Sequence, residues 1–276
     1  MFEVAKVVDQ LMTIENAPLN KLNAKVESKQ IVLDSVGLLK NSVKTLAADL
    51  KALENYGNFS SKADVKAVLE KVAASFTEVN QGIVEAAGIK LVKGRYTTGA
   101  LTGDSLVATL KKVLSDAWFA GVDFKSDLQD NSSPQVPYST ATPRNLVFSE
   151  LGLSRASDGT VSFDSARFEK MATRIDLVGA FNQGASTKLY AGVPGQYNGL
   201  NHAVNFASGI FSSRTDQLNS ELYKLSARVD DLTSKLAVTK DRLTQQYSRY
   251  NSIIAQLQGS NNYLSSFLAS QNKSYG

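Results

Sequence analysis

The last quarter of the chain carries an apolar repeat that restricts what this chain can fold into. Between residues 218 and 236, leucine or valine returns at alternating steps of four and three residues. Such steps keep one stripe of a helix facing a partner helix, as in a coiled coil. After a skip, the stripe resumes at Tyr250, Ile254, Leu257, Leu264 and Leu268. We therefore predict one long helix over residues 212–270 that packs against other helices.

The end of this predicted helix differs from the rest in its charge. Both signs of charge occur between Arg214 and Arg249, whereas after Tyr250 only Lys273 is charged. A helix without charges can pack on several neighbours without burying ions, which is costly. We expect this tail to be buried in an assembly, and a frayed end is the alternative.

The N-terminal region contains the second long helical pattern. Val4, Val8, Leu11 and Ile14 form one stripe, and residues 32–53 form another at four-three spacing. We expect a break near Pro18, because proline lacks the N–H of a helical residue. These stripes are covered if the C-terminal helix folds back. The sequence thus predicts a mainly α fold whose long terminal helices form an antiparallel coiled coil or bundle.

The middle of the chain is predicted to be smaller and mixed. A helix should begin after Ser61 and bury residues 65–83 along one stripe, and shorter helices should run from Asp104 or Ser105 to Leu114 and from Asp164 to Met171. Residues 153–163 are expected to form a β-hairpin around Gly159, and residues 184–199 a flexible stretch. We divide the chain into a terminal leg, 1–32 with 247–276, and a body, 33–246.

Composition removes several classes of function. The chain of 276 residues has no cysteine, a net charge of +4 and no basic run that would indicate nucleic acid. No stretch approaches the length of a membrane span, so membrane insertion is not expected. The acidic residues of the first ten positions argue against a secretory signal peptide.

Catalytic and metal-binding patterns are scarce. His202 is the only histidine, which excludes a histidine pair for a metal. Asp123, Asp127 and Asp130 lack the spacing of a calcium loop. Trp118 is expected in the core. We predict a structural protein without catalytic residues, metal or cofactor, and an enzyme with a site in the loop 123–145 is the alternative.

Five blocks of the sequence, taken in order, carry a family resemblance. They are residues 7–12 (VVDQLM), 101–105 (LTGDS), 151–164 (LGLSRASDGTVSFD), 209–216 (GIFSSRTD) and 250–257 (YNSIIAQL). In this order they resemble the bacterial flagellar filament cap, hook-associated protein 2. Members of that family usually insert large, mostly β domains after the first long helix, whereas here residues 56–60 (YGNFS) lead directly to the next helix. The resemblance therefore implies a minimal cap that lacks the outer domains.

The resemblance implies a non-enzymatic protein that is exported by the flagellar type III apparatus and forms a homo-oligomeric ring at the filament tip outside the cell. There it would promote insertion and polymerisation of flagellin. Its terminal helices would contact flagellin or hook–filament junction proteins, and an export chaperone would bind the C-terminal region. The runner-up is another axial component of a type III system, such as a junction or needle-tip protein. The expected contact residues are Val4, Val8, Leu11, Ile14, Tyr250, Ile254, Leu257, Leu264 and Leu268.

Overall fold

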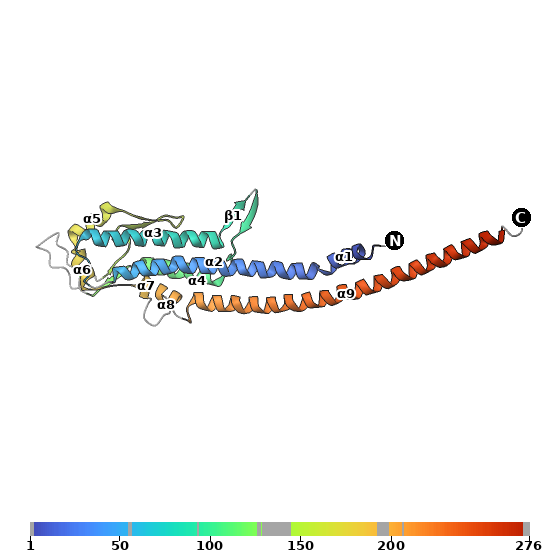
Figure 1. Ribbon diagram of the computed structural model, residues 1–276. Helices are drawn as coiled ribbons and strands as arrows, with labels where there is room; N and C mark the ends of the chain where they lie inside the picture. Colours follow the sequence, from blue (N-terminus) through green and yellow to red (C-terminus); the bar gives the residue numbers. More distant parts are fainter. Residues whose placement is uncertain are drawn as a thin grey trace, which may run out of the picture. The chain divides into compact units, whose positions relative to one another are not determined.

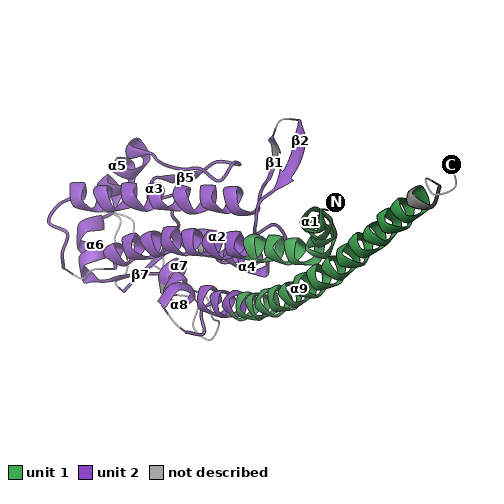
Figure 2. Cartoon of the chain, turned by 45° about the vertical axis from the view of Figure 1, so that its right-hand side comes forward, with its two compact units in different colours: residues 1–29, 220–276 green, residues 30–219 purple. Residues whose placement is uncertain are grey.

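The computed structural model divides the chain into two compact units, coloured green and purple in Figure 2. It describes residues 3–54, 57–92, 94–125, 128, 145–191, 199–205 and 207–272. Unit 1 comprises residues 1–29 and 220–276, and unit 2 comprises residues 30–219. Two long helices, α2 (Ala17–Leu53) and α9 (Ile210–Asn272), contribute to both units. The mainly α fold with long terminal helices, predicted from the sequence, is confirmed.

Unit 1 is an antiparallel arrangement of α1 (Val4–Glu15), the start of α2 and most of α9 (Figure 1). Three contacts show that the helices are antiparallel, because later residues of α1 and α2 contact earlier residues of α9. Asp9 pairs with Lys240 at 3.5 Å, Leu19 packs in one cluster with Leu232, and Lys29 pairs with Glu221 at 2.7 Å. The expected break falls at Asn16, and Pro18 lies in the first turn of α2, where its missing N–H costs little.

The core of unit 2 is built on three helices: the remainder of α2, α3 (Lys62–Ala87) and α4 (Ser105–Ala120). Helix α3 begins with a capping box, in which the Ser61 hydroxyl accepts from the Asp64 N–H and Asp64 accepts from the Ser61 N–H. The predicted stripe of α3 is fully buried, and so is most of the four-three stripe of α2. The buried α3 residues of that stripe are Val65, Leu69, Val72, Phe76, Val79 and Ile83.

Among the described residues of unit 2, the strands form three small sheets. The predicted hairpin is confirmed as β5 (Leu153–Arg155) paired antiparallel with β6 (Val161–Phe163). A second hairpin pairs β1 (Ile89–Val92) with β2 (Arg95–Thr98). The third sheet has the order β4 (Asn145–Leu146), β3 (Val122–Phe124) and β7 (Ala185–Thr187), all antiparallel.

Side chains of α3 hold the β5–β6 hairpin in place. The Thr77 hydroxyl donates to the Val161 carbonyl at 2.9 Å and accepts from the Val161 N–H at 2.8 Å. The Asn80 amide donates to the Gly159 carbonyl at 2.7 Å. Gly159 has a φ of +88°, a backbone conformation that side chains with a Cβ rarely adopt. The turn expected at this glycine is therefore present.

Short helices add buried residues to this core, and the part of unit 2 that is described contains α5 (Ser165–Arg174), α6 (Leu177–Gln183), α7 (Lys188–Ala191) and α8 (Leu200–Asn205). Asp164 caps α5 by accepting from the Arg167 N–H at 3.0 Å, as predicted. Trp118 is buried as expected and packs edge-on against Phe76 and at a tilt against Phe148, with ring centroids 5.2 and 5.5 Å away.

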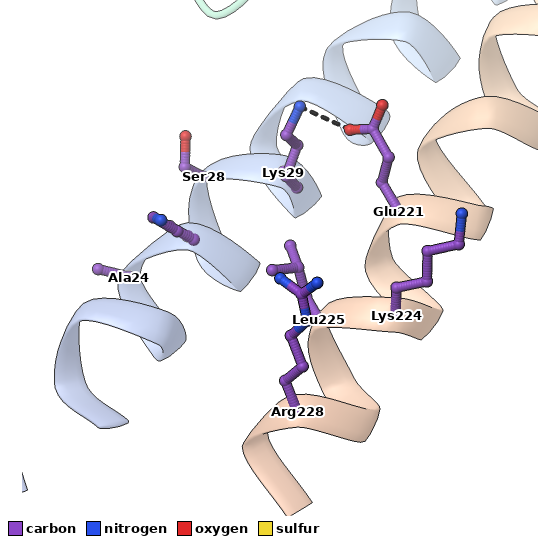
Figure 3. Close-up of a pocket in the computed structure, with 8 residues that line it drawn as sticks. Ala24, Ser28, Lys29, Glu221, Lys224, Leu225 and Arg228 are labelled. Atoms are coloured by element: carbon purple, nitrogen blue, oxygen red, sulfur yellow. Dashed lines mark ion pairs between the residues drawn. The ribbon is translucent and has the colours of Figure 1, made fainter. Parts of the chain in front are cut away.

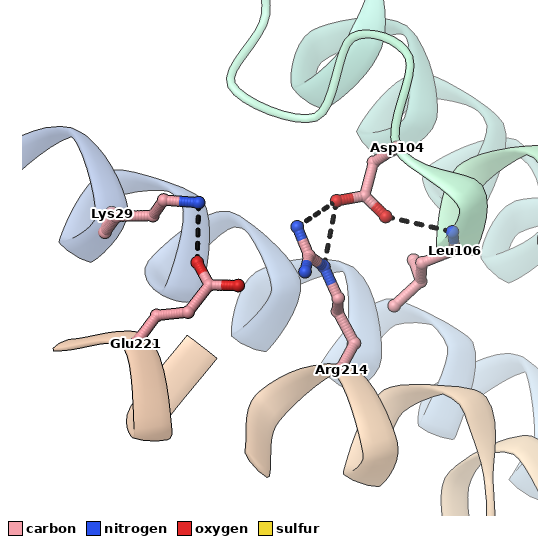
Figure 4. Close-up of polar contacts among 5 residues, drawn as sticks. All are labelled: Lys29, Asp104, Leu106, Arg214 and Glu221. Atoms are coloured by element: carbon pink, nitrogen blue, oxygen red, sulfur yellow. Dashed lines mark hydrogen bonds and ion pairs between the residues drawn. The ribbon is translucent and has the colours of Figure 1, made fainter. Parts of the chain in front are cut away.

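The start of α9 is tied to the start of α4 inside unit 2 (Figure 4). The Arg214 guanidinium donates twice to one oxygen of Asp104, at 2.9 and 2.6 Å. The other Asp104 oxygen accepts from the Leu106 N–H at 2.9 Å, so one carboxylate caps α4 and binds α9. Both charged side chains are largely buried, which makes this pair dependent on its geometry.

The structure corrects two local predictions, and a third concerns residues that it does not describe. The helix expected to end at Leu114 continues to Ala120, because Leu114 and Trp118 extend its buried stripe by another turn. The glycine-rich stretch predicted to be flexible includes β7 and α7 at its beginning. Asp127 and Asp130 of the polar loop lie outside the described residues.

Candidate functional site

The four predicted contact residues on α1 do not share one environment. Val8 is buried with Met12 and Leu236, and Val4 packs against this cluster from the same side. Leu11 is half-buried, whereas Ile14 is 72% exposed. Val4 and Val8 are therefore occupied by packing within unit 1, and of the four only Ile14 presents most of its surface.

The five predicted residues on α9 lie together on a part of the helix that unit 1 leaves uncovered. Helix α1 covers the α9 stripe as far as Leu243 and Tyr247, and α9 continues beyond it (Figures 1 and 2). Past Asn251, every side chain described up to residue 269 is exposed. The exposed fractions of the five residues lie between 43% and 64%: Tyr250, Ile254, Leu257, Leu264 and Leu268.

Two further large side chains belong to the same surface, and the sequence analysis missed them. Ile253 and Phe267 are about half exposed and stand fourteen residues apart, on the column next to Tyr250, Leu257 and Leu264. Following one stripe alone hid this column, although Ile253 and Phe267 are separated by two heptads and therefore lie on nearby parts of the helix surface. We call the seven residues the terminal face: Tyr250, Ile253, Ile254, Leu257, Leu264, Phe267 and Leu268.

The electrostatics of the terminal face are unusual for an exposed helix. Residues 251–272 contain no charged side chain, and serine, asparagine and glutamine flank the apolar columns. Burying this surface against other helices would remove apolar area from water without stripping the hydration of an ion. The arrangement is suited to packing with more than one neighbouring helix. None of the helices described here is long and apolar enough to cross a membrane.

A groove of about 570 Å³ lies between the start of α2 and the facing part of α9, both in unit 1 (Figure 3). The short side chains of Ala24 and Ser28 leave room over Leu225. Four of the eight lining residues are basic and one, Glu221, is acidic. Glu221 forms an ion pair with Lys29 at 2.7 Å. The groove therefore carries an excess of positive charge. The lining residues are Ala24, Lys25, Ser28, Lys29, Glu221, Lys224, Leu225 and Arg228.

The basic groove was not predicted, although its residues follow a simple rule. Lys25 and Lys29 are four positions apart on α2, and Lys224 and Arg228 are four apart on α9. Residues four apart lie on the same face of a helix, so each pair adds its charges to one surface. The sequence pattern alone did not show that these two basic faces lie opposite each other in unit 1.

Burial and hydrogen bonds within unit 2 shift the pKa values of two carboxyl groups. Burial raises the pKa of Glu54 above its ordinary value of 4.5, while hydrogen bonds from Thr187 and the charge of Lys51 oppose that shift. Hydrogen bonds from Thr160 lower the pKa of Asp158 in the hairpin turn. In the described part of the chain no three His, Asp or Glu residues are placed to hold a metal ion. Asp123, once weighed for calcium, accepts from the Asn145 amide at 2.7 Å.

Comparison with known proteins gives one assignment. No match was found among curated proteins. The family described as flagellar hook-associated protein 2 C-terminus matches residues 16–259, which include α2, unit 2 and most of α9. The match covers far more than half of the chain, and it contains the last four of the five sequence blocks. The chain therefore belongs to the flagellar hook-associated protein 2 family, a structural family of the bacterial flagellum.

Proposed function

We propose that this chain caps the distal tip of the bacterial flagellar filament and promotes the insertion and polymerisation of exported flagellin. In this role it forms a homo-oligomeric ring outside the cell after export by the flagellar type III apparatus. It has no catalytic activity in this role. The family assignment supports a cap in preference to the runner-up, a hook–filament junction or needle-tip protein.

The observation that carries the proposal is the terminal face. Seven large apolar side chains are exposed on one side of a helix end that has no charge. A monomer gains nothing from this surface, whereas an assembly gains the burial of all seven side chains at once. We infer that the terminal face contacts helices of flagellin or of hook–filament junction proteins.

The ends of the chain and its body have different roles in this proposal. Ile14, the most exposed of the predicted α1 residues, extends the contact surface of the N-terminal end. We propose that residues 1–32 and 247–276 act as the leg that enters the assembly, and that residues 33–246 act as the body. The same C-terminal region offers an apolar surface that an export chaperone would cover before export.

The substitution Ile254→Asp tests the contact directly. Ile254 lies on the terminal face and is exposed, so an aspartate there has little to disrupt in the monomer, and the melting temperature should stay within about 2 °C. In the assembly it would bury a charge without a partner, at a cost of several kcal/mol for each copy. Flagellin should then leave the cell as unpolymerised monomer, and motility should be lost.

The matched control is Ser252→Asp, which adds the same charge two residues away on the opposite side of α9. Filaments and motility should persist in that strain. Both variants are measured by electron microscopy of filaments, by swimming assays and by blotting of the secreted fraction. Normal filaments in the Ile254→Asp strain, with the variant present outside the cell, would overturn the assignment of the terminal face.

A further inference from the structure

The hairpin β1–β2 exposes apolar side chains that neither the family match nor the proposed function explains. It projects from the end of α3 and stands clear of the helices of unit 2 (Figure 1). Ile89 is 68% exposed, Val92 49% and Tyr96 81%. A two-stranded hairpin is marginally stable on its own in water, so one with exposed apolar residues gains from a surface that covers it.

The pairing of the strands separates the hairpin into two faces. Ile89 pairs with Thr98, which places Ile89 and Tyr96 on one face, because alternate residues point to the same side. Val92 pairs with Arg95, and both lie on the other face. Residues 89–98 contain three basic residues and no acidic one. The hairpin thus offers an aromatic side chain on one side and a cation on the other.

A groove with the complementary chemistry lies between α2 and α3 in the same unit. Its volume is about 420 Å³, and both Gly82 and Leu39 line it. The α2 wall presents Leu38, one of the most exposed leucines among the described residues. The α3 wall presents Glu78 and Glu85, and no lining residue is basic. The Ser42 hydroxyl donates to Glu78 at 3.1 Å, and neither glutamate forms an ion pair with a described residue.

We propose that the β1–β2 hairpin of one copy docks into the α2–α3 groove of a second copy. Tyr96 would pack against Leu38, while Arg95, on the opposite face, would reach Glu78 and Glu85. Tyrosine and arginine are the side chains that most often carry the affinity of an interface. Each copy carries both the β1–β2 hairpin and the α2–α3 groove, so the contact can repeat from copy to copy. The inference rests on the ring-forming part of the proposed function and is independent of what the terminal face contacts.

A charge-exchange experiment on the full chain tests this contact. Arg95→Glu would place like charges together, as would Glu85→Arg, and each should raise the dissociation constant for self-association by about tenfold or more. Both residues are exposed in the monomer, so folding should be unaffected. An equimolar mixture of the two variants should associate again, because the altered hairpin of one fits the altered groove of the other. Sedimentation velocity over a range of concentrations measures all three samples.

Lys111→Glu and Glu169→Arg are the matched controls, since both residues are exposed on other helices of unit 2. They should associate like the unaltered chain. Tyr96→Ser should weaken association without any change of charge. Association of Arg95→Glu and Glu85→Arg at the unaltered strength would overturn the docking contact, and so would a chain that stays monomeric at every concentration. Neither result bears on Ile254→Asp, whose outcome is read from filaments, so the two proposals fail separately.

Discussion

At the start of α9, Phe211 and Leu218 are fully buried, whereas at its other end Leu257 and Leu264 expose more than half of their surface. The residue types and the spacing are similar in the two regions. The difference lies in the neighbours: unit 2 supplies a core around the first pair, whereas the described residues of unit 1 leave the second pair exposed. An apolar period therefore predicts that a helix face will be covered, but it does not say whether the covering residues belong to the same chain.

Truncating a large side chain should have very different effects in the buried core of unit 2 and on the exposed end of α9. Phe76→Ala removes a fully buried ring that packs edge-on against Trp118, and it should lower the free energy of unfolding by about 3–5 kcal/mol. Leu257→Ala on the terminal face should change it by less than about 0.5 kcal/mol. Urea denaturation followed by circular dichroism measures both. Similar losses for the two variants would mean that the terminal face is packed in the monomer.

The same substitution at two glycines, one in a turn of unit 2 and one on the exposed end of α9, should also have different effects. Gly159→Val should destabilise unit 2 by about 1–3 kcal/mol, because valine is strained at a φ of +88° and its Cβ would lie 3.2 Å from that of Asn80. Gly259→Val, on the exposed end of α9, has open space and a helical backbone, so the change should be close to zero. Thermal unfolding of the two variants decides the matter, and equal melting temperatures would contradict the turn geometry.

The third and smallest effect concerns charge. Unit 2 half-buries the carboxylate of Glu54, which accepts from the Thr187 N–H at 2.7 Å, whereas the terminal face has no carboxylate. Because burial raises its pKa, folded Glu54 binds a proton more tightly than unfolded Glu54 does. Its contribution to stability is therefore present below pH 4.5 and is lost as the pH rises through the folded pKa.

Glu54→Gln keeps an oxygen acceptor and removes this titration. The stability of the variant relative to the unaltered chain should increase as the pH rises from about 4 to 7. Melting temperatures across that range provide the measurement. A difference that is constant with pH would show that Glu54 is as well solvated in the folded chain as in the unfolded one.

The long helices could be predicted from the sequence because their signal is local and repeated. The α3 stripe, the Ser61 cap and the turn at Gly159 each depend on residues a few positions apart. The sheet β4–β3–β7 could not be predicted in this way. It pairs Val122 with Thr187, sixty-five residues away, through strands of two or three residues that carry no period of their own.

The candidate contact surfaces were likewise predicted only where a local sequence repeat marked them. Five residues of the terminal face followed from one stripe, and Ile253 and Phe267 required attention to the adjacent column. The β1–β2 hairpin was missed because residues 89–92 (IKLV), three apolar residues and a lysine, form a segment too short to distinguish a strand from a helix. Its exposure depends on tertiary structure: a strand rich in apolar residues is ordinarily predicted to be buried.

The absence of charge from residues 251–272 also bears on where a contact made by this segment can work. Dissolved ions weaken attractions between charges over about 10 Å at 0.1 M salt, and acidity alters them through protonation. A contact without charges is insensitive to both, and salt acts on it only by modestly strengthening the burial of apolar surface. A contact of this kind would remain stable at low and high salt concentrations and across a wide range of pH.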